Sequence, residues 1–564
     1  MLLYKISEAI GKQIVLFLGL ILFYVSIFIT FNAHIHPSIF YLSLITTILI
    51  FIVIQIKNIK VNYFEYTLSV LAFLFVVFLA FKIAPLYYDF SFDGQGYQQN
   101  GTISLKEGWN PLYDEELGDL WIDHYAKGNW YISAVFYAAF DQLELIKAYN
   151  VLMLLAAFFL LIAVLKSLHV HVALIIPIAL VTAANPVTIT QLFTTYNDGL
   201  IGPALICLMI MIYFVFKRKS ALNYCVLAAV IVIISNIKFT AFGYAVIVCG
   251  VPIVYMMLSY NIRSWWNVFK NKYLHYVLIT AGSFLLAILF VGSTSYVSNT
   301  IDHGHPFFPL AGEGKVDIMT PNMPQSLVGT SWGEKLFRSV FSETANFIEG
   351  EPKLKNPFTV SQDEIWSSGD VDIRVAGLGP LFGATLILTV LSALLTCLYI
   401  FKRENRFLWY VFLALVLTIA INPEPWWMRY IPQLWLVVAM LIIIVYKSSK
   451  LGQWLAALCV TVMLLNVGLV AHGTKGKLDM NLENLTQQLE VMRKYSEENE
   501  LLIDLHWSTG NRIRFEEYGI KYKELVFYNT DLDPAICELF VYIQSSTARV
   551  CTKDEKLLND LTVQ

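Results

Sequence analysis

Residues 199–216 read GLIGPALICLMIMIYFVF, and Lys217, Arg218 and Lys219 follow them directly. The run contains no charged side chain and is long enough for a helix to cross the hydrocarbon core of a membrane. Basic residues at the end of such a run are typical of the cytoplasmic end of a span. This segment therefore predicts a membrane-spanning helix, and the chain contains many similar runs.

The composition of the whole chain indicates a polytopic membrane protein. Of its 564 residues, 57% are hydrophobic and 14% are charged, whereas soluble globular proteins carry about 25% charged residues. The formal net charge of −3 and the lack of a Lys/Arg block argue against nucleic acid as a partner. We predict about thirteen transmembrane helices, at 12–31, 38–56, 64–84, 145–165, 173–193, 199–216, 221–236, 240–259, 273–293, 376–400, 407–421, 430–446 and 453–470.

Short connections rich in Lys and Arg give the predicted orientation. With thirteen spans, all of these connections lie on the side of the amino terminus, which the positive-inside rule makes cytoplasmic. The extracytoplasmic side then receives two long loops, 85–130 and 294–375, and the tail. We expect a transmembrane domain over 1–470, with basic connections that carry Lys57 and Lys60, Lys217, Arg218 and Lys219, Arg263, Lys270 and Lys272, Lys402, Arg403 and Arg406, and Lys447 and Lys450.

Residues 471–564 lack long apolar runs and predict a small extracytoplasmic α/β domain. A helix over 480–499 is expected, followed by three strands, at 501–505, near 524–528 and near 539–544. Cys537 and Cys551 lie on the side of the membrane where disulfides persist. The sequence leaves open whether they form a disulfide or remain free thiols.

The first long loop, 85–130, combines acidic and aromatic side chains. Carboxylates accept hydrogen bonds from sugar hydroxyl groups, and aromatic rings pack on the apolar faces of sugars, so this composition suits a carbohydrate site. A solvated acidic loop with aromatic residues at the membrane interface explains the composition equally well. The residues are Asp89, Asp93, Glu107, Asp114, Glu115, Glu116, Asp119 and Asp123, with Tyr87, Tyr88, Tyr97, Trp109, Tyr113, Trp121 and Tyr125.

Four charged residues stand at the predicted extracytoplasmic ends of spans: Asp93, Asp198, Lys238 and Arg429. Ionisable groups in such positions are costly and are often functional. Two cations there would hold the phosphate of a lipid-linked donor, and a carboxylate would take the proton of an acceptor hydroxyl group. The alternative is that the two cations extend to lipid headgroups and bind no substrate.

Six short segments between residues 60 and 446 carry a resemblance to a known family. They are Phe92-Asp93-Gly94 with Tyr97; Glu107-Gly108-Trp109-Asn110-Pro111 with His124-Tyr125-Ala126-Lys127-Gly128; Tyr196-Asn197-Asp198; Asn236-Ile237-Lys238-Phe239-Thr240; His305-Pro306-Phe307-Phe308-Pro309; and Arg429-Tyr430-Ile431-Pro432. In their order and predicted sidedness, the chain resembles the GT-C superfamily of polytopic membrane glycosyltransferases. It is most similar to the bacterial branch related to protein O-mannosyltransferases and lipid A aminoarabinose transferases.

The resemblance implies a transferase that moves a hexosyl or pentosyl group from a polyprenyl-phosphate donor to a glycan, lipid or protein acceptor outside the cell membrane. It implies Asp93 as the leading catalytic carboxylate, with Asp198 and Asp89 as further candidates. Lys238 and Arg429 would bind the donor phosphate. Substrate contacts are expected from Tyr97, Trp109, His124, Lys127, His303 and His305. Two features depart from the family pattern: Gln98 and Gln99 follow Tyr97, where a Tyr-His pair is common, and two extra spans precede the first long loop.

Metal dependence is left open by the sequence. His34 with His36, His169 with His171, and His303 with His305 have H-x-H spacing, but a pair without a third ligand is a weak metal signal. His303 and His305 either contact substrate or pack within their loop.

Two other function classes compete with the transferase. An O-antigen polymerase or ligase also joins lipid-linked glycans outside the cell, although such enzymes depend on arginines in outer loops, which are few here. A transporter or flippase of lipid-linked glycans would place its site at the membrane midplane, between inverted repeats. The position of the main cavity would separate these classes.

Overall fold

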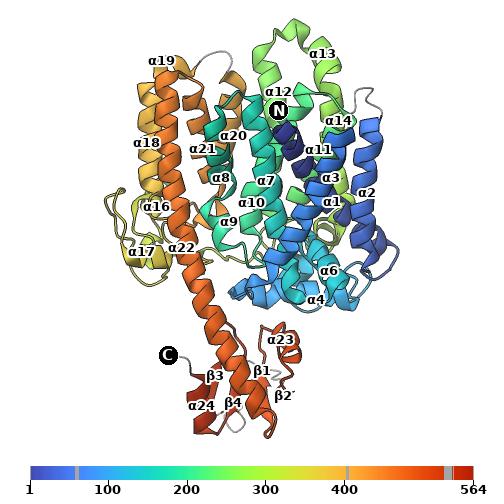
Figure 1. Ribbon diagram of the computed structural model, residues 1–564, viewed down its shortest axis with the longest axis vertical. Coiled ribbons are helices and arrows are strands. Elements are labelled where there is room, and N and C mark those ends of the chain that lie inside the picture. Colours follow the sequence, from blue (N-terminus) through green and yellow to red (C-terminus); the bar gives the residue numbers. More distant parts are fainter. Residues whose placement is uncertain (1, 57–62, 402–404, 526–536, 538, 563–564) are drawn as a thin grey trace.

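The chain is mostly helical and carries a small sheet near its carboxyl end (Figure 1). A computed structural model describes residues 2–56, 63–401, 405–525, 537 and 539–562. Seven segments in these ranges are long and apolar enough to cross a membrane. They contain α1 (Leu2–Thr30), α3 (Tyr63–Ile83), α7 (Ala148–Ser167), α10 (Asp198–Lys217), α12 (Phe239–Ser259), α14 (Leu274–Leu286) and α22 (Lys450–Tyr495).

Shorter apolar helices occupy the other six positions predicted for spans. They are α2 (Ser38–Ile56), α8 (Val172–Ala183), α11 (Ala221–Ser235), α18 (Phe382–Leu395), α20 (Arg406–Ala420) and α21 (Gln433–Tyr446). The count of thirteen membrane crossings stays a prediction.

The span predicted over 173–193 is divided in the structure. Helix α8 ends at Ala183, and the short helix α9 (Pro186–Thr190) follows it. Asn185 caps α9, because its side-chain oxygen accepts a hydrogen bond of 3.0 Å from the Thr188 amide. Proline at the first position of a helix is favoured because its missing N–H needs no partner there. The apolar run therefore holds two helices.

Helix α1 lies inside the bundle and packs against α2, α3, α7 and α11. Ile14, Phe17, Leu18 and Ile21 are fully buried. The Phe17 ring packs edge-on against Phe40, with 5.5 Å between ring centroids. This apolar core holds the helices whose ends carry the charged residues described below.

Polar contacts join helix ends at the end of the bundle opposite the sheet. Glu8 accepts hydrogen bonds from Arg218, the shorter at 2.6 Å, and forms an ion pair with Lys12. Lys219 donates to the Asn271 carbonyl oxygen at 3.1 Å. Helices α13 (Trp265–Val268) and α19 (Cys397–Ile400) lie at this end (Figure 1). The side of the membrane that this end faces stays a prediction.

The two long loops fold as short helices at the other end of the bundle (Figure 1). The first loop forms α4 (Gln99–Glu107) and α5 (Leu120–His124), and α6 (Gly128–Phe140) begins at its end. The second loop forms α15 (Ser298–His303), α16 (Trp332–Phe341) and α17 (Gln362–Ser367).

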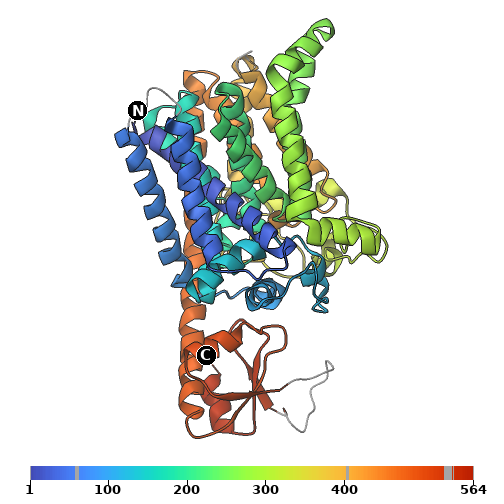
Figure 2. The same ribbon diagram turned by 90° about the vertical axis from the view of Figure 1, so that its right-hand side faces the viewer.

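The predicted boundary at 470/471 falls inside a single helix. Helix α22 runs for 46 residues from the bundle into the tail, where it packs on the sheet domain (Figure 2). The separate helices expected at 453–470 and 480–499 are therefore one element. We call residues 496–562, with the adjoining end of α22, the tail domain.

The tail domain contains a four-stranded mixed sheet in the order β2-β1-β4-β3. Strand β1 pairs parallel to β2 and antiparallel to β4, and β4 pairs antiparallel to β3. A disulfide joins Cys537 to Cys551, which resolves the choice that the sequence left open. The elements are β1 (Leu501–Asp504), α23 (Asn511–Glu517), β2 (Tyr522–Glu524), β3 (Leu539–Tyr542), β4 (Arg549–Thr552) and α24 (Glu555–Leu561).

Candidate active site

A pocket of about 180 Å³ lies at the helix ends nearest the tail domain. Asp198 begins α10, Lys238 precedes α12 as its N-cap, and Arg429 lies in the short turn before α21. Asp93 follows the extended segment that leaves α3. The structure thus brings together the four charged residues singled out from the sequence. The pocket is lined by Asp93, Tyr97, Trp121, Tyr125, Tyr196, Asn197, Asp198, Lys238, Ile318, Asn322, Trp427, Arg429 and Tyr430.

Lys238 and Asp198 form a buried ion pair. The Lys238 ammonium donates to Asp198 Oδ1 at 2.6 Å, and it also lies 3.9 Å from the centre of the Tyr430 ring. Their side chains are 9% and 2% exposed. A buried charge of this kind needs a close partner, because removal from water is expensive. Asp198 is therefore fixed in place and holds the ammonium at the pocket wall.

Arg429 stands at the centre of three carboxylates. Its guanidinium nitrogens lie 3.7 Å from Asp93 Oδ2, 3.7 Å from Asp198 Oδ2 and 3.1 Å from Asp372 Oδ1. The guanidinium also packs 4.2 Å from the Trp427 ring centre. Both cations, Lys238 and Arg429, therefore face carboxylates of the protein itself.

Two nitrogens of Arg429 nevertheless lack a well-aligned hydrogen bond. Nε and Nη1 are buried and make no well-aligned hydrogen bond to any residue that the structure describes, although Asp372 Oδ1 faces Nη1 at 3.1 Å. The third nitrogen, Nη2, donates to the Tyr430 hydroxyl group at 3.1 Å. Buried donors without acceptors are rare in folded proteins and call for an explanation, such as a ligand. A planar guanidinium with two such nitrogens suits a phosphate.

Asp372 was missed by the sequence analysis. It lies in the second long loop, four residues before the predicted span 376–400. The criterion that selected Asp93, an acid next to the outer end of a span, would also have found it. Burial, together with the nearby carboxylates of Asp93 and Asp198, raises the pKa of Asp372 to about 6, although Arg429 and Arg374 favour its charged form.

Aromatic rings form much of the pocket wall. Tyr97 contacts the rings of Trp121 and Tyr125, with centroid separations of 6.4 and 6.0 Å. Tyr196 and Tyr430 flank the Arg429 guanidinium, each with its ring centre 5.0 Å away. Rings beside carboxylates are suited to the apolar and hydroxylated faces of a sugar. Tyr97 therefore occupies the place expected of a substrate contact.

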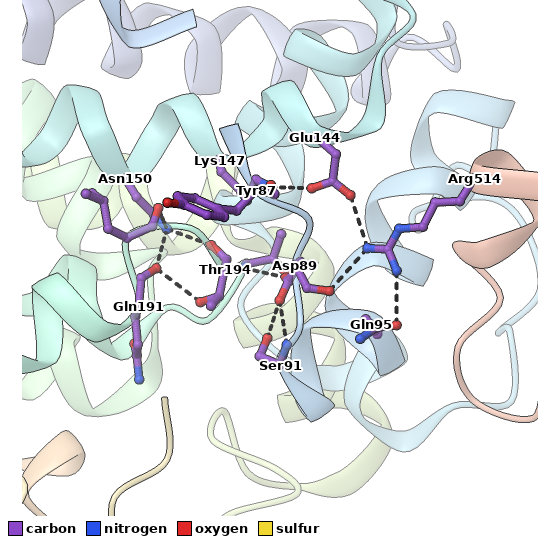
Figure 3. Close-up of polar contacts among 12 residues, drawn as sticks. Tyr87, Asp89, Ser91, Gln95, Glu144, Lys147, Asn150, Gln191, Thr194 and Arg514 are labelled. Atoms are coloured by element: carbon purple, nitrogen blue, oxygen red, sulfur yellow. Dashed lines mark hydrogen bonds and ion pairs between the residues drawn. The ribbon is translucent and has the colours of Figure 1, made fainter. Parts of the chain in front are cut away.

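Asp89 lies outside the pocket lining and is fully buried (Figure 3). One carboxylate oxygen accepts hydrogen bonds from the Ser91 amide and hydroxyl groups, at 2.9 and 2.5 Å. The other accepts from the Thr195 amide and hydroxyl groups, both at 2.7 Å. These bonds tie the segment that carries Asp93 to the segment before α10. We assign Asp89 this structural role and no longer a catalytic one.

The buried guanidinium of Arg514 joins the tail domain to the same segment (Figure 3). It donates to the Asp89 carbonyl oxygen and to Glu144 Oε1, both at 3.1 Å, and to Gln95 Oε1 at 3.2 Å. Glu144 also pairs with Lys147. The tail domain thus contacts the chain on both sides of Asp93.

This contact gives a prediction for the tail. Arg514→Met removes one partner of a buried charge network, which typically costs about 3–5 kcal/mol. We expect the variant to expose residues 88–98 to hydrogen exchange and to melt at a lower temperature. Arg512→Met is the matched control, because Arg512 lies on the same helix but its ion pair with Glu524 is solvent-exposed and worth about 0–1 kcal/mol. Equal hydrogen exchange of residues 88–98 in the two variants would mean that Arg514 does not hold this segment in place.

The remaining expected substrate contacts lie outside the pocket lining. Trp109 donates to the Glu115 carbonyl oxygen at 3.1 Å, and His124 bonds the Asn299 side chain at 3.1 Å. The His303 ring stacks on Phe308, and His305 accepts from the Phe307 amide at 3.1 Å. These residues pack the loops, and the structure gives no support for direct substrate contact.

Lys127 is buried beneath the pocket wall. Its ammonium donates to the carbonyl oxygens of Asp123 at 2.7 Å, and of Tyr125 and Thr294 at 3.3 Å. Burial lowers the pKa of Lys127 to about 7. Lys127 therefore positions the loop that presents Trp121 and Tyr125, and it does not reach the pocket.

Among the residues that the structure describes, no group of three or more His, Cys, Asp or Glu side chains is arranged to hold a metal ion. The three carboxylates of the site, Asp93, Asp198 and Asp372, face the Arg429 guanidinium. No known family model matches the chain, and no curated protein is significantly similar to it.

Proposed function

We propose that the chain is a membrane glycosyltransferase that moves a sugar from a polyprenyl-phosphate donor to an acceptor on the extracytoplasmic face. The observation that carries the proposal is the Arg429 guanidinium. It has two buried nitrogens without a well-aligned hydrogen bond, one of which faces Asp372, and it stands beside Lys238 in a pocket that also holds carboxylates and aromatic rings. A phosphate would satisfy both donor groups and would place the attached sugar among the rings.

An apolar groove beside the pocket suits the lipid part of such a donor. The groove has a volume of about 390 Å³ and runs along α12, from Phe239 to Ile247. Phe239 directly follows Lys238, and Tyr244 in the groove donates to the Tyr430 carbonyl oxygen at 3.1 Å. If the donor phosphate binds Lys238 and Arg429, the hydrocarbon chain of the donor would lie along α12.

In the proposed reaction, the acceptor hydroxyl oxygen forms a bond to the anomeric carbon of the sugar while the bond from that carbon to the phosphate oxygen breaks. Asp93 takes the hydroxyl proton, and the polyprenyl phosphate leaves with the bonding electron pair. Lys238 and Arg429 stabilise the charge that develops on the leaving phosphate. Asp198 holds both cations in position.

The location of the pocket favours a transferase over a transporter. All four charged residues lie at helix ends, whereas transporters bind substrate near the membrane midplane between broken helices. A transport assay with the same lipid-linked sugar in sealed vesicles tests this choice. We expect no movement of the unreacted donor between leaflets.

The charge of the pocket predicts that donor binding depends on pH. Arg374 also lies 3.8 Å from Asp372, so the ionised cluster of Asp93, Asp198, Asp372, Lys238, Arg429 and Arg374 carries no net charge. Asp372, whose pKa is about 6, takes up a proton as pH falls through that value, and the cluster gains a charge of +1, which favours an anion. A sugar phosphodiester keeps its single charge over this range.

We therefore expect donor affinity to rise as the pH falls from about 7.5 to about 5. The gain in affinity is about tenfold for each pKa unit by which the bound anion raises the pKa of Asp372. Asp372→Asn should bind tightly at all these pH values. Titration with a fluorescent donor analogue at several pH values measures the donor affinity of the wild type and of Asp372→Asn. A wild-type pH response in Asp372→Asn would exclude Asp372 as the responsible group.

A further inference from the structure

A second cavity, of about 210 Å³, lies at the end of the bundle opposite the tail domain. It is enclosed by α7, α10, α20 and α21, with one residue from α8. Its walls are almost entirely aliphatic and aromatic, and the polar side chains among its lining residues are Thr182, Tyr213 and Lys447. It shares no lining residue with the candidate active site.

The cavity opens toward the helix ends and runs inward along the helices. Leu168, Phe407 and Lys447, which lie at the ends of α7, α20 and α21, are half-buried, whereas Leu161 and Leu436 are buried. Lys447 and Leu436 both line the cavity, and their separation on α21 corresponds to about 16 Å of helix. The cavity is thus a narrow apolar slot that is suited to an extended hydrocarbon chain.

Two ammonium groups stand together at the mouth of this slot. Lys447 donates to the Leu168 carbonyl oxygen at 3.1 Å, and Lys217 bonds the hydroxyl group of the adjacent residue, Ser167. Lys217 also donates to the Tyr213 hydroxyl group at 3.1 Å. In the described parts of the chain, neither ammonium has a carboxylate within 4.0 Å. Among the residues that the structure describes, the mouth therefore carries positive charge without a paired acid.

We propose that this cavity binds an anionic phospholipid, with one acyl chain in the slot and the phosphate between Lys217 and Lys447. Anionic headgroups are attracted to basic residues at membrane surfaces, and basic pockets between membrane helices bind them. A zwitterionic lipid could fill the slot but would gain little from the two cations. The assignment is independent of the proposed enzymatic function, because it uses none of the same residues.

The competing explanation is that both lysines only stabilise the end of α7. Cations near a helix C-terminus interact favourably with the last carbonyl groups. That role requires no lipid, and it predicts that charge removal lowers stability equally in the presence and absence of any lipid.

The test uses the purified full chain in neutral detergent. Native mass spectrometry and thermal melting are measured with phosphatidylglycerol and with phosphatidylcholine of the same acyl chains. We expect phosphatidylglycerol to bind more tightly and to raise the melting temperature. The double variant Lys217→Gln/Lys447→Gln should lose about 10- to 30-fold in affinity for phosphatidylglycerol alone.

Two further variants complete the test. Lys219→Gln/Lys450→Gln, which removes two exposed lysines at the same end of the bundle, should bind as the wild type does. Ala439→Phe, which fills the slot, should weaken binding of both lipids. Equal affinity of the wild type for the two lipids, or an unchanged preference for phosphatidylglycerol in Lys217→Gln/Lys447→Gln, would overturn the proposal. If Ala439→Phe fails to fold, the two lysine pairs still decide the question.

Discussion

Replacement of Asp93 by asparagine is expected to lower the rate of sugar transfer by about 100-fold or more while donor binding persists. Asp93 is the least constrained carboxylate of the site. Its side chain is 26% exposed and faces the pocket, and its ion-pair contact with Arg429 is long, at 3.7 Å. Asparagine keeps the shape of the side chain but cannot accept the proton of the acceptor. Single-turnover kinetics with bound donor measure the chemical step separately from binding.

Glu116→Gln provides the matched control for Asp93→Asn. Glu116 lies in the same loop, and its side chain is 68% exposed, so its loss should leave transfer unchanged. Asp89→Asn should instead lower stability, since Asp89 accepts four hydrogen bonds inside the fold. Normal transfer by Asp93→Asn would remove Asp93 from the mechanism and would make Asp372 the next candidate for the base.

Donor affinity is expected to fall by about 10- to 150-fold in Arg429→Ala, which corresponds to the loss of a charged hydrogen bond worth about 1.5–3 kcal/mol. The guanidinium has two nitrogens without a well-aligned hydrogen bond that would match two phosphate oxygens, and a single ammonium cannot reproduce this fork. Arg429→Lys should therefore lose less affinity than Arg429→Ala but should not bind as the wild type does. Equilibrium binding of a non-transferable donor analogue gives the donor affinity of the wild type, Arg429→Ala and Arg429→Lys.

Arg429 also neutralises nearby carboxylates, so its removal threatens folding as well as binding. Lys335→Ala controls for this effect, because Lys335 forms a similarly buried ion pair with Glu424 outside the pocket. Thermal melting shows which variants remain folded, and Arg429→Lys retains the charge. If folded Arg429→Lys and Lys238→Ala both bound the donor with wild-type affinity, the cations would serve the fold or the lipid headgroups and not the donor.

The sequence located the charged residues of the site through a simple physical rule. Asp93, Asp198, Lys238 and Arg429 stand at the ends of apolar runs, where charge is expensive and seldom placed without a purpose. Their mutual pairing could not be predicted, because it depends on how α10, α12 and α21 pack. Asp89 also lies near the end of an apolar run, but its carboxylate accepts a hydrogen bond from Thr195 inside the fold. The two residues are more than 100 positions apart in the sequence, so this contact could not be predicted.

Most helices could be predicted from the sequence, but the end of α22 and strand β4 could not. The end of α22 was placed at 470 because the apolar run ends there, yet a change from apolar to polar residues does not itself stop a helix. No proline occurs between 471 and 495 to interrupt it. Strand β4 was missed because it is only four residues long and its two central residues, Val550 and Cys551, are both buried, so the sequence shows no alternation of polar and apolar residues.

The most direct test of glycosyl transfer uses the purified full chain in lipid nanodiscs with a polyprenyl-phosphate donor that carries a radiolabelled sugar. Candidate acceptors are supplied as cell-envelope glycan, lipid and peptide fractions, and Asp93→Asn serves as the inactive control. We predict that label moves from the lipid donor to one acceptor fraction and that polyprenyl phosphate is released in equal amount. Tight binding of the donor without transfer of label to any of the three fractions, and without release of polyprenyl phosphate, would contradict the proposed function.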